Sequence, residues 1–242
     1  MTTLLVTGTG TGVGKTVVTA ALAACARAAG RSVAVVKPVQ TGVRDGEIGD
    51  VEEIERLAGV AGRAHVRLPD PLAPQRAARL AGVDLPPLEE HAERIRILRE
   101  DLVLVEGAGG VLVRLDGATG TLAGLACLLP GSSVLVVVGP QLGTLNQTEL
   151  TIEALRARRV AVLGLVIGCW PADPGLAERS NWEDLPTVTG VPLLGALPGG
   201  VGALSPAAFR ASATRWLAPS LGGSWRDPSN VTGLSSVVSG GK

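Results

Sequence analysis

The segment Gly8–Thr16, which reads GTGTGVGKT, constrains the fold of this chain more than any other segment. It directly follows the apolar run Leu4–Thr7 and opens a helix expected over Lys15–Ala29. Glycines let successive backbone N–H groups turn toward an anion, and the amino terminus of a helix adds partial positive charge. This context predicts a phosphate-binding loop (P-loop), in which Lys15 reaches the terminal phosphates and Thr16 holds Mg²⁺.

The loop is a variant of the common motif. Five residues separate Gly8 from Gly14, whereas the usual pattern has four. The alternative interpretation is a tight strand-to-helix turn without a ligand. That interpretation makes the Gly-Lys-Thr at the start of the helix accidental, so phosphate binding is favoured.

Short aliphatic runs recur along the chain, with helix-length segments between them. Strands that are apolar throughout are typical of a parallel sheet covered on both faces. The pattern predicts the α/β class, with a doubly wound, mostly parallel sheet in a single P-loop NTPase-like domain over 1–218. Strands are expected at Leu4–Thr7, Val33–Lys37, Leu102–Glu106, Ser133–Val138, Val162–Ile167 and Pro192–Ala196. Helices are expected at Lys15–Ala29, Asp50–Ala58, Leu88–Arg99, Leu122–Leu128 and Leu145–Ala157.

Composition and charge limit the cellular compartments and the binding partners that are expected for this protein. Because 22 Lys and Arg balance 22 Asp and Glu, we expect no general attraction to nucleic acid or to an anionic membrane. The apolar runs are strand-sized, and no signal peptide precedes the first strand. Three widely spaced cysteines suit reduced thiols, which predicts a cytoplasmic protein. Residues 219–242 are rich in Gly, Ser and Pro, and we predict a mobile tail there.

Charged residues at the ends of two predicted strands suggest a catalytic site at the same edge as the P-loop. Glu106 ends one strand and precedes a glycine-rich turn, so it is a candidate Mg²⁺ ligand. Lys37 ends another strand and supplies a second cation suited to a phosphoryl group in transit. His65 and His91 have no Cys or His neighbour at metal-ligand spacing, and we expect His91 to be exposed on its helix.

Four motifs together resemble the dethiobiotin synthetase family in order and spacing. They are the loop Thr7–Thr16, the segment Lys37–Gly42 (KPVQTG), Val105–Gly110 (VEGAGG) and Leu142–Asn146 (LGTLN). The resemblance spans about Met1 to Leu197 and is far more specific than any single motif. It implies an ATP-dependent ligase of biotin biosynthesis. That enzyme closes a ureido ring on 7,8-diaminononanoate with CO₂ through a carbamate and a mixed phosphoric anhydride, and releases ADP and phosphate.

The resemblance also implies roles for individual residues. The nucleotide would contact Gly12, Val13, Gly14, Lys15, Thr16, Val17 and Gly168; Mg²⁺ would bind Thr16, Asp50 and Glu106. Lys37, Lys15 and Thr11 would be catalytic. The substrates would meet Thr41, Lys37, Gly109 and, from the second subunit of a homodimer, Thr144, Leu145 and Asn146. The acidic ligand near position 50 stays open among Asp45, Glu47, Asp50 and Glu52, and an acid there also suits the start of a helix.

Several positions depart from the family pattern. Position 12 is Gly where some members have Glu, Gln147 stands where His is expected, and the chain contains no Tyr. Gly168 occupies the position of an Asn that hydrogen-bonds the adenine edge. The co-substrate is therefore expected to be ATP, with CTP or another nucleoside triphosphate as the alternative.

Other P-loop proteins offer competing hypotheses. An amidoligase of the cobyrinic acid diamide type would need a glutaminase domain, for which this chain has no room. A partition or targeting ATPase would carry a second Lys at the start of the loop, and the segment Thr7–Thr11 has none. A GTP switch would carry Asn-Lys-x-Asp, which is absent from the sequence.

Overall fold

A computed structural model describes residues 2–44 and 46–227. In this part of the chain, seven parallel strands form one sheet in the order β3-β2-β4-β1-β5-β6-β7. The strands are β1 Thr2–Gly8, β2 Val33–Thr41, β3 Gly62–Leu68, β4 Leu102–Gly110, β5 Ser133–Val138, β6 Val162–Trp170 and β7 Leu193–Pro198. The predicted fold class is confirmed.

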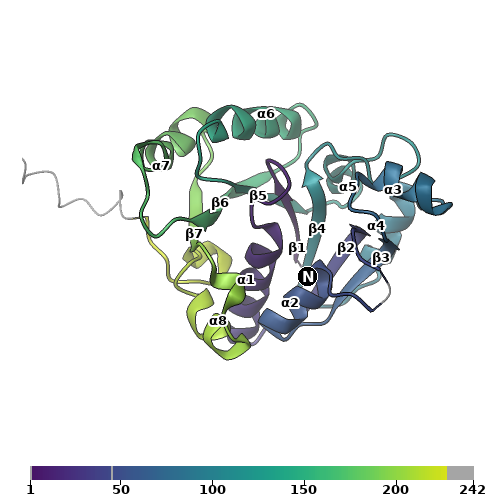
Figure 1. Cartoon of the computed structure of the whole chain (residues 1–242), viewed down its shortest axis with the longest axis horizontal. Coiled ribbons are helices and arrows are strands. Elements are labelled where there is room, and N and C mark those ends of the chain that lie inside the picture. Colours follow the sequence, from purple (N-terminus) through teal and green to yellow (C-terminus); the bar gives the residue numbers. More distant parts are fainter. Residues whose placement is uncertain (1, 45, 228–242) are drawn as a thin grey trace, which may run out of the picture.

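Helices cover both faces of the sheet (Figure 1). They are α1 Lys15–Ala28, α2 Asp50–Ala58, α3 Pro74–Ala81, α4 Leu88–Arg96, α5 Leu122–Cys127, α6 Thr144–Arg156, α7 Leu176–Thr189 and α8 Pro206–Ala213, with short 3₁₀ turns η1 Val201–Ala203 and η2 Pro219–Leu221. Alternate residues of the strands contribute to two cores. Leu4 and Val6 of β1 pack with α1, α2 and α8, whereas Leu5 faces the core under α3 to α7.

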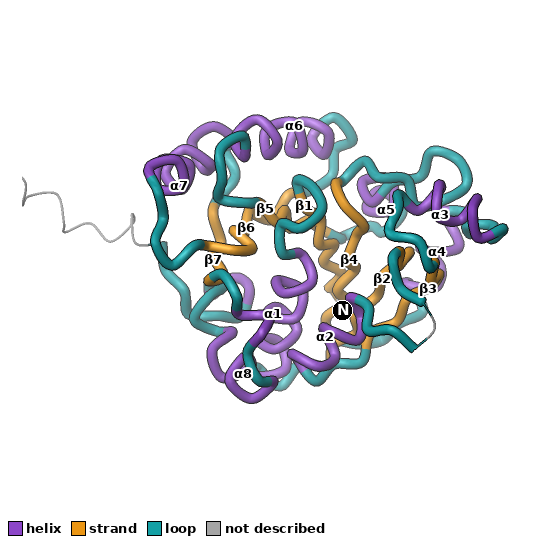
Figure 2. The backbone as a smooth tube through the Cα atoms, viewed as in Figure 1, coloured by secondary structure: helices purple, strands orange, loops and turns teal. Residues whose placement is uncertain are grey.

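The central position of β1 explains where the site lies. β1 pairs with β4 on one side and with β5 on the other, so its neighbours belong to opposite halves of the sheet. In doubly wound sheets, ligands bind at such a switch point, outside the carboxyl ends of the strands. Figure 2 shows the loop from β1 to α1 leaving the middle of the sheet.

Four elements were not predicted from the sequence, for identifiable reasons. β3 is an edge strand, and its sequence GRAHVRL lacks a continuous apolar run. α3 begins with Pro74 after a proline-rich stretch that hides the start of a helix, although proline suits the first helical turn. α7 contains Pro186, which disguises its helical pattern, and α8 is a short helix of eight residues.

The exposure predicted for His91 is wrong. Its side chain is fully buried and stacks on His65 of β3, with ring centroids 5.1 Å apart and Nδ1 atoms 2.8 Å apart. His91 shares a helix face with Leu88 and Ile95, so the helical period in fact placed it toward the core.

The first residues of the predicted tail pack against the rest of the protein. Leu221 is buried, and Trp225 lies 5.9 Å, between ring centroids, from Trp182 of α7. The Trp182 Nε1 group donates a hydrogen bond to Asp227 Oδ1 at 3.1 Å. Residues 228–242 lie outside the described residues, and the mobility expected for them stays a prediction.

Candidate active site

The P-loop is held between the ends of β5 and β6. The Thr9 backbone N–H donates to the Val137 carbonyl at 3.1 Å. Gly14 has φ of 95°, and a Cβ there would lie 2.7 Å from the Gly168 oxygen. Glycine is therefore required at position 14 both by backbone conformation and by close packing.

The side chain of Lys15, the first residue of α1, reaches back over the P-loop. Its Nζ donates to the Gly10 carbonyl at 2.9 Å, and its side chain is buried. Burial lowers the pKa of this ammonium, while the nearby Glu106 acts in the opposite direction. The amine is thus placed to exchange its carbonyl partner for a phosphate oxygen.

Four side chains from four elements, α1, β2, α2 and β4, converge beside the loop. Lys37 lies in the middle of β2, which runs on to Thr41 rather than ending at Lys37 as predicted. Its Nζ donates to Glu106 Oε1 of β4 at 2.7 Å and pairs with Asp50 Oδ2 at the start of α2. Thr16 Oγ1 donates to the same Glu106 Oε1 at 3.1 Å. The structure therefore brings together Thr16, Lys37, Asp50 and Glu106, which sequence reasoning had assigned to one site.

The charges of this cluster depend on one another. Burial opposes the charge on Lys37, but Glu106 and Asp50 outweigh it and raise its pKa. Burial likewise opposes ionisation of Asp50, but Lys37 outweighs it and lowers the carboxyl pKa. A lysine cation and a carboxylate are therefore the stable forms at neutral pH.

The oxygen atoms of the cluster suit a hard divalent cation. Glu106 is fully buried, and its Oε2 has no hydrogen-bond partner within residues 2–44 and 46–227. Leaving a carboxylate oxygen buried and unpaired is costly, so a missing partner is expected there. Two carboxylates and a hydroxyl are the donor types that Mg²⁺ prefers, and the residues fit the ion.

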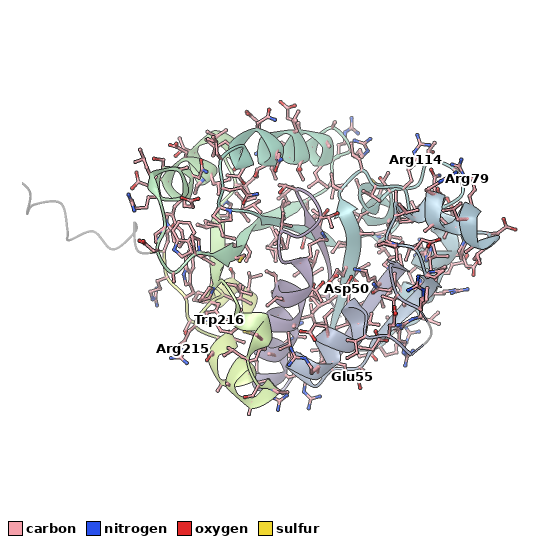
Figure 3. The ribbon with its side chains drawn as sticks, in the orientation of Figure 1. Asp50, Glu55, Arg79, Arg114, Arg215 and Trp216 are labelled. Atoms are coloured by element: carbon pink, nitrogen blue, oxygen red, sulfur yellow. The ribbon has the colours of Figure 1, made fainter. Side chains whose placement is uncertain are left out.

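The described acidic residues near position 50 differ in what they contact. Asp50 points into the cluster and is labelled near the centre of Figure 3, with Glu55 farther along the same helix. Glu52 instead pairs with Arg67 and accepts from the Gly49 backbone N–H. Glu47 accepts from the exposed Arg44 backbone N–H, and Asp45 lies outside the described residues.

A cleft of about 960 Å³ opens over the cluster. The predicted site residues that line it are Thr11, Gly12, Gly14, Lys15, Thr16, Val17, Lys37, Thr41, Asp50, Glu106 and Gly109. Its far wall is apolar and includes Val43, Ile48, Pro71 and Leu72. The cleft therefore joins a charged end to an end that can accept a hydrocarbon chain.

The other predicted contacts lie outside this cleft. Val13 and Gly168 belong to the packing of the loop, since a Cβ on Gly168 would lie 2.0 Å from the Val13 oxygen. Thr144 is buried at the start of α6, with Leu145 and Asn146 following, and none of the three lines the cleft. In the single chain, α6 is not part of this site.

Gln40 is a site residue that the sequence analysis missed. It is buried and lines the cleft, and its Oε1 accepts from the Asp50 backbone N–H at 3.1 Å. Its Nε2 lies 3.5 Å from Asp50 Oδ2, so the amide fits around both ends of that residue. The only signal in the sequence was its place inside the KPVQTG segment.

Comparisons with known proteins agree with the motifs. A family model described as an AAA domain matches residues 2–200. The ATP-dependent dethiobiotin synthetase BioD of Streptomyces avermitilis is 58% identical over 230 residues, covering 93% of this chain and 95% of that protein. Its namesake in Streptomyces coelicolor is 59% identical, with the same coverage. The Rhodococcus jostii protein of the same name is 55% identical and covers 89% of this chain and 94% of its own.

Solved structures of lower similarity share the architecture. The MinC:MinD cell division complex of Aquifex aeolicus has a TM-score of 0.54 at 15% identity, covering 88% of this chain and 86% of that chain. The septum site-determining protein MinD of Pyrococcus horikoshii, complexed with Mg-ADP, has a TM-score of 0.54 at 19% identity. The match covers 87% of this chain and 89% of that chain. At these identities the likeness concerns the fold alone. In the described part of the chain, no helix is both long enough and apolar enough to cross a membrane.

Proposed function

This chain belongs to the ATP-dependent dethiobiotin synthetase family, and from that premise we propose that its cleft binds a Mg²⁺–nucleotide and a diamine side by side. The reaction is ring closure on 7,8-diaminononanoate with CO₂, in biotin biosynthesis. The observation that carries this proposal is the cluster of Lys37, Asp50 and Glu106 beside the P-loop. Such a cluster is superfluous in a phosphate binder without catalysis.

The nucleotide would lie along the loop and the start of α1. Backbone N–H groups of Gly12 to Val17 would hold the phosphates, with Lys15 at the γ-phosphate. Thr16, Asp50 and Glu106 would hold Mg²⁺, which would supply neutralisation of the phosphate charge. The donor atoms of all three residues lie within the charged end of the cleft.

The diamine would occupy the other side of Lys37. One of its amines takes up CO₂ and becomes a carbamate, which Lys37, Thr11 and Thr41 would orient. A carbamate oxygen attacks the γ-phosphorus, ADP leaves, and the second amine attacks the carbonyl carbon of the resulting anhydride. Phosphate departs, the urea ring closes, and the protons lost from nitrogen pass to phosphate or water.

The protein contributes position and charge rather than a covalent nucleophile. Fixed ammonium groups neutralise charge that develops on the transferred phosphoryl group without reorganising during the reaction. Lys15 approaches from the loop, and Lys37 approaches from β2. The glycine at position 109 leaves backbone accessible to the substrate, since its φ of 62° already excludes most side chains.

The base would be read by backbone groups near the end of β6. Gly168 has no room for a side chain, because a Cβ there would lie 2.0 Å from the P-loop carbonyl oxygen of Val13. An Asn that reads adenine therefore cannot occupy this position without moving the loop. We propose that discrimination among ATP, CTP and GTP is weaker than an amide side chain would give.

The proposed assembly is a cytoplasmic homodimer. The start of α6 would receive the carboxylate of the substrate bound to the other subunit, through the backbone N–H groups of Thr144, Leu145 and Asn146. Support comes from Leu142 beside it, which is 84% exposed and leaves an apolar side chain on the surface.

The test is phosphate release by the purified protein with Mg²⁺, 7,8-diaminononanoate and bicarbonate, in parallel with ATP, CTP and GTP. The product is identified by mass. Release that requires the diamine and yields the cyclic urea supports the proposal; release indifferent to the diamine contradicts it. Asp50→Asn should abolish turnover, whereas the matched control Glu55→Gln, on the exposed side of the same helix, should not change it.

A further inference from the structure

Lysine is rare in this protein, and its placement is selective. Of the 22 basic residues only three are lysines, at positions 15, 37 and 242. Lys242 lies outside the described residues, and the other two lie in the cleft. Arginine supplies all other basic side chains, so the two cleft positions use the compact, mobile ammonium where the rest of the chain uses guanidinium.

The ammonium of Lys37 contacts the oxygens that are proposed to bind the metal. Its Nζ donates to Glu106 Oε1 at 2.7 Å and pairs with Asp50 Oδ2. The side chain of Lys37 is 4% exposed and that of Glu106 is fully buried, so water screens this pair poorly. The Thr16 hydroxyl shares the same Glu106 oxygen.

Lys15 differs from Lys37 in its partner. The Lys15 Nζ donates to the Gly10 carbonyl at 2.9 Å and forms no ion pair within residues 2–44 and 46–227. A divalent ion that approaches Asp50 and Glu106 therefore competes directly with Lys37 and only through space with Lys15. The two lysines form a natural experimental pair.

From these contacts we propose that Lys37 is an exchangeable counter-ion, which occupies the place of the divalent cation and is released toward the substrate side of the cleft when the cation binds. The inference rests on the proposed function in one respect, the assignment of Thr16, Asp50 and Glu106 to the metal. The inference adds a coupling between metal binding and substrate binding, because binding of the metal frees the Lys37 ammonium that is proposed to orient the carbamate.

Charge explains why exchange is favoured over shared occupancy. Lys37 is the cation in direct contact with Asp50 and Glu106, and Lys15 adds a second ammonium nearby, so two formal positive charges face two formal negative ones before a metal binds. A divalent ion in contact with the same oxygens would repel the ammonium at close range in a poorly screened site. The four-carbon stem of lysine can swing away, and Thr41 lines the same cleft as Lys37.

The first test measures metal affinity without nucleotide or substrate. Binding of Mn²⁺ is followed by electron paramagnetic resonance in the wild type, in Lys37→Met and in the matched control Lys15→Met. We expect Lys37→Met to bind Mn²⁺ at least about tenfold more tightly, equivalent to about 1.4 kcal/mol, and Lys15→Met to change affinity by less than about threefold. Unchanged or weaker binding by a folded Lys37→Met protein overturns the proposal.

A second measurement uses the wild-type protein and does not depend on correct folding of Lys37→Met. With only three lysines in the chain, the ¹⁵N signals of the ammonium groups in the wild type are few, and Lys37→Arg identifies the signal of Lys37 by its loss. We expect that signal to shift or vanish through solvent exchange on titration with Mg²⁺, while the Lys15 signal changes less. A Lys37 signal that stays unchanged at saturating Mg²⁺ overturns the exchange.

Failure of the inference and failure of the proposed function give different results. If the wild type forms the cyclic urea but Lys37→Met binds Mn²⁺ no more tightly, the exchange is wrong and the function stands. If Lys37→Met binds Mn²⁺ more tightly but no diamine-dependent product appears, the exchange stands and the substrate assignment is wrong.

Discussion

The two halves of the sheet end differently at the site. β2 and β4 contribute the charged or amide side chains Lys37, Gln40 and Glu106, all buried and all lining the cleft. β6 and β7 instead present glycines: Gly168 packs on the P-loop, and Gly199 follows β7. Charge is concentrated where phosphoryl transfer is proposed, whereas the opposite half offers close backbone packing.

The comparison teaches that one cleft can use two kinds of specificity. Fixed charges must match the charge that develops during the reaction, so individual side chains matter on the β2–β4 side. On the β6–β7 side the fit depends on the absence of side chains. Substitutions should therefore fail for opposite reasons in the two halves, by loss of a group in one and by addition of a group in the other.

The largest effect is expected from Glu106→Gln on the charged side. The amide keeps the shape of the side chain but removes the charge shared by Thr16 and Lys37. We expect kcat to fall by roughly 10²–10³-fold, the usual loss for one group that stabilises a transition state. Steady-state kinetics of diamine-dependent phosphate release checks this, with circular dichroism to confirm folding. A loss below about fivefold would remove Glu106 from the proposed mechanism.

Gly168→Ala tests the opposite half by adding a single carbon. Its Cβ would lie 2.0 Å from the Val13 oxygen, so the P-loop must shift. We expect a loss of about 1–3 kcal/mol in the free energy of unfolding and about tenfold weaker nucleotide binding. Calorimetric titration and urea unfolding measure both. Gly117→Ala is the matched control because its Cβ meets open space; equal behaviour of the two variants would contradict the packing argument.

Sequence predicted the charged half better than the packed half. The continuous apolar run at Ser133–Val138 predicted β5 with the bounds that the structure shows. Parallel strands also bring their carboxyl ends to one edge of the sheet. Lys37 and Glu106 were therefore found, although β2 and β4 each continue for four residues beyond the strand ends predicted there. Gln40 and the packing role of Gly168 depend on contacts between distant segments, which no local pattern contains. β3 and α7 were missed because an edge strand and a helix with an internal proline lack the usual periodicity.

The pair formed by the buried His91 and the half-buried His65 lies outside both halves of the site and predicts acid sensitivity of the fold. Burial, followed by the neighbouring His91 and Arg94, lowers the pKa of His65 from 6.5 to about 4. Burial and Arg94 also lower the pKa of His91, against the opposing effects of Glu90 and Asp116. The unfolded chain binds more protons between these values, so stability is fully present above pH 6.5 and falls toward pH 4.

The expected loss is about 2–3 kcal/mol across this range, measured by urea unfolding at a series of pH values. His65→Asn removes one of the two titrating imidazole rings. The free energy of unfolding should then depend less steeply on pH between 6.5 and 4. If the variant keeps the full slope, the acid sensitivity arises elsewhere. If activity falls in acid while the fold stays intact, the cleft rather than this pair is responsible, which sharpens the contrast between site and scaffold.

The smallest effect is expected from Gln40→Ala, because Gln40 acts on the charged half only through Asp50. Its Oε1 accepts the Asp50 backbone N–H at 3.1 Å, and loss of one such bond costs about 1 kcal/mol. We expect the Mg²⁺ concentration for half-maximal activity to rise about fivefold at nearly unchanged kcat. Gln75→Ala is the control, since Gln75 bonds to the Asp116 and Ala118 carbonyls instead. A fall in kcat at saturating Mg²⁺ would instead indicate contact with the substrate, because a group that only positions a metal ligand is compensated by excess metal.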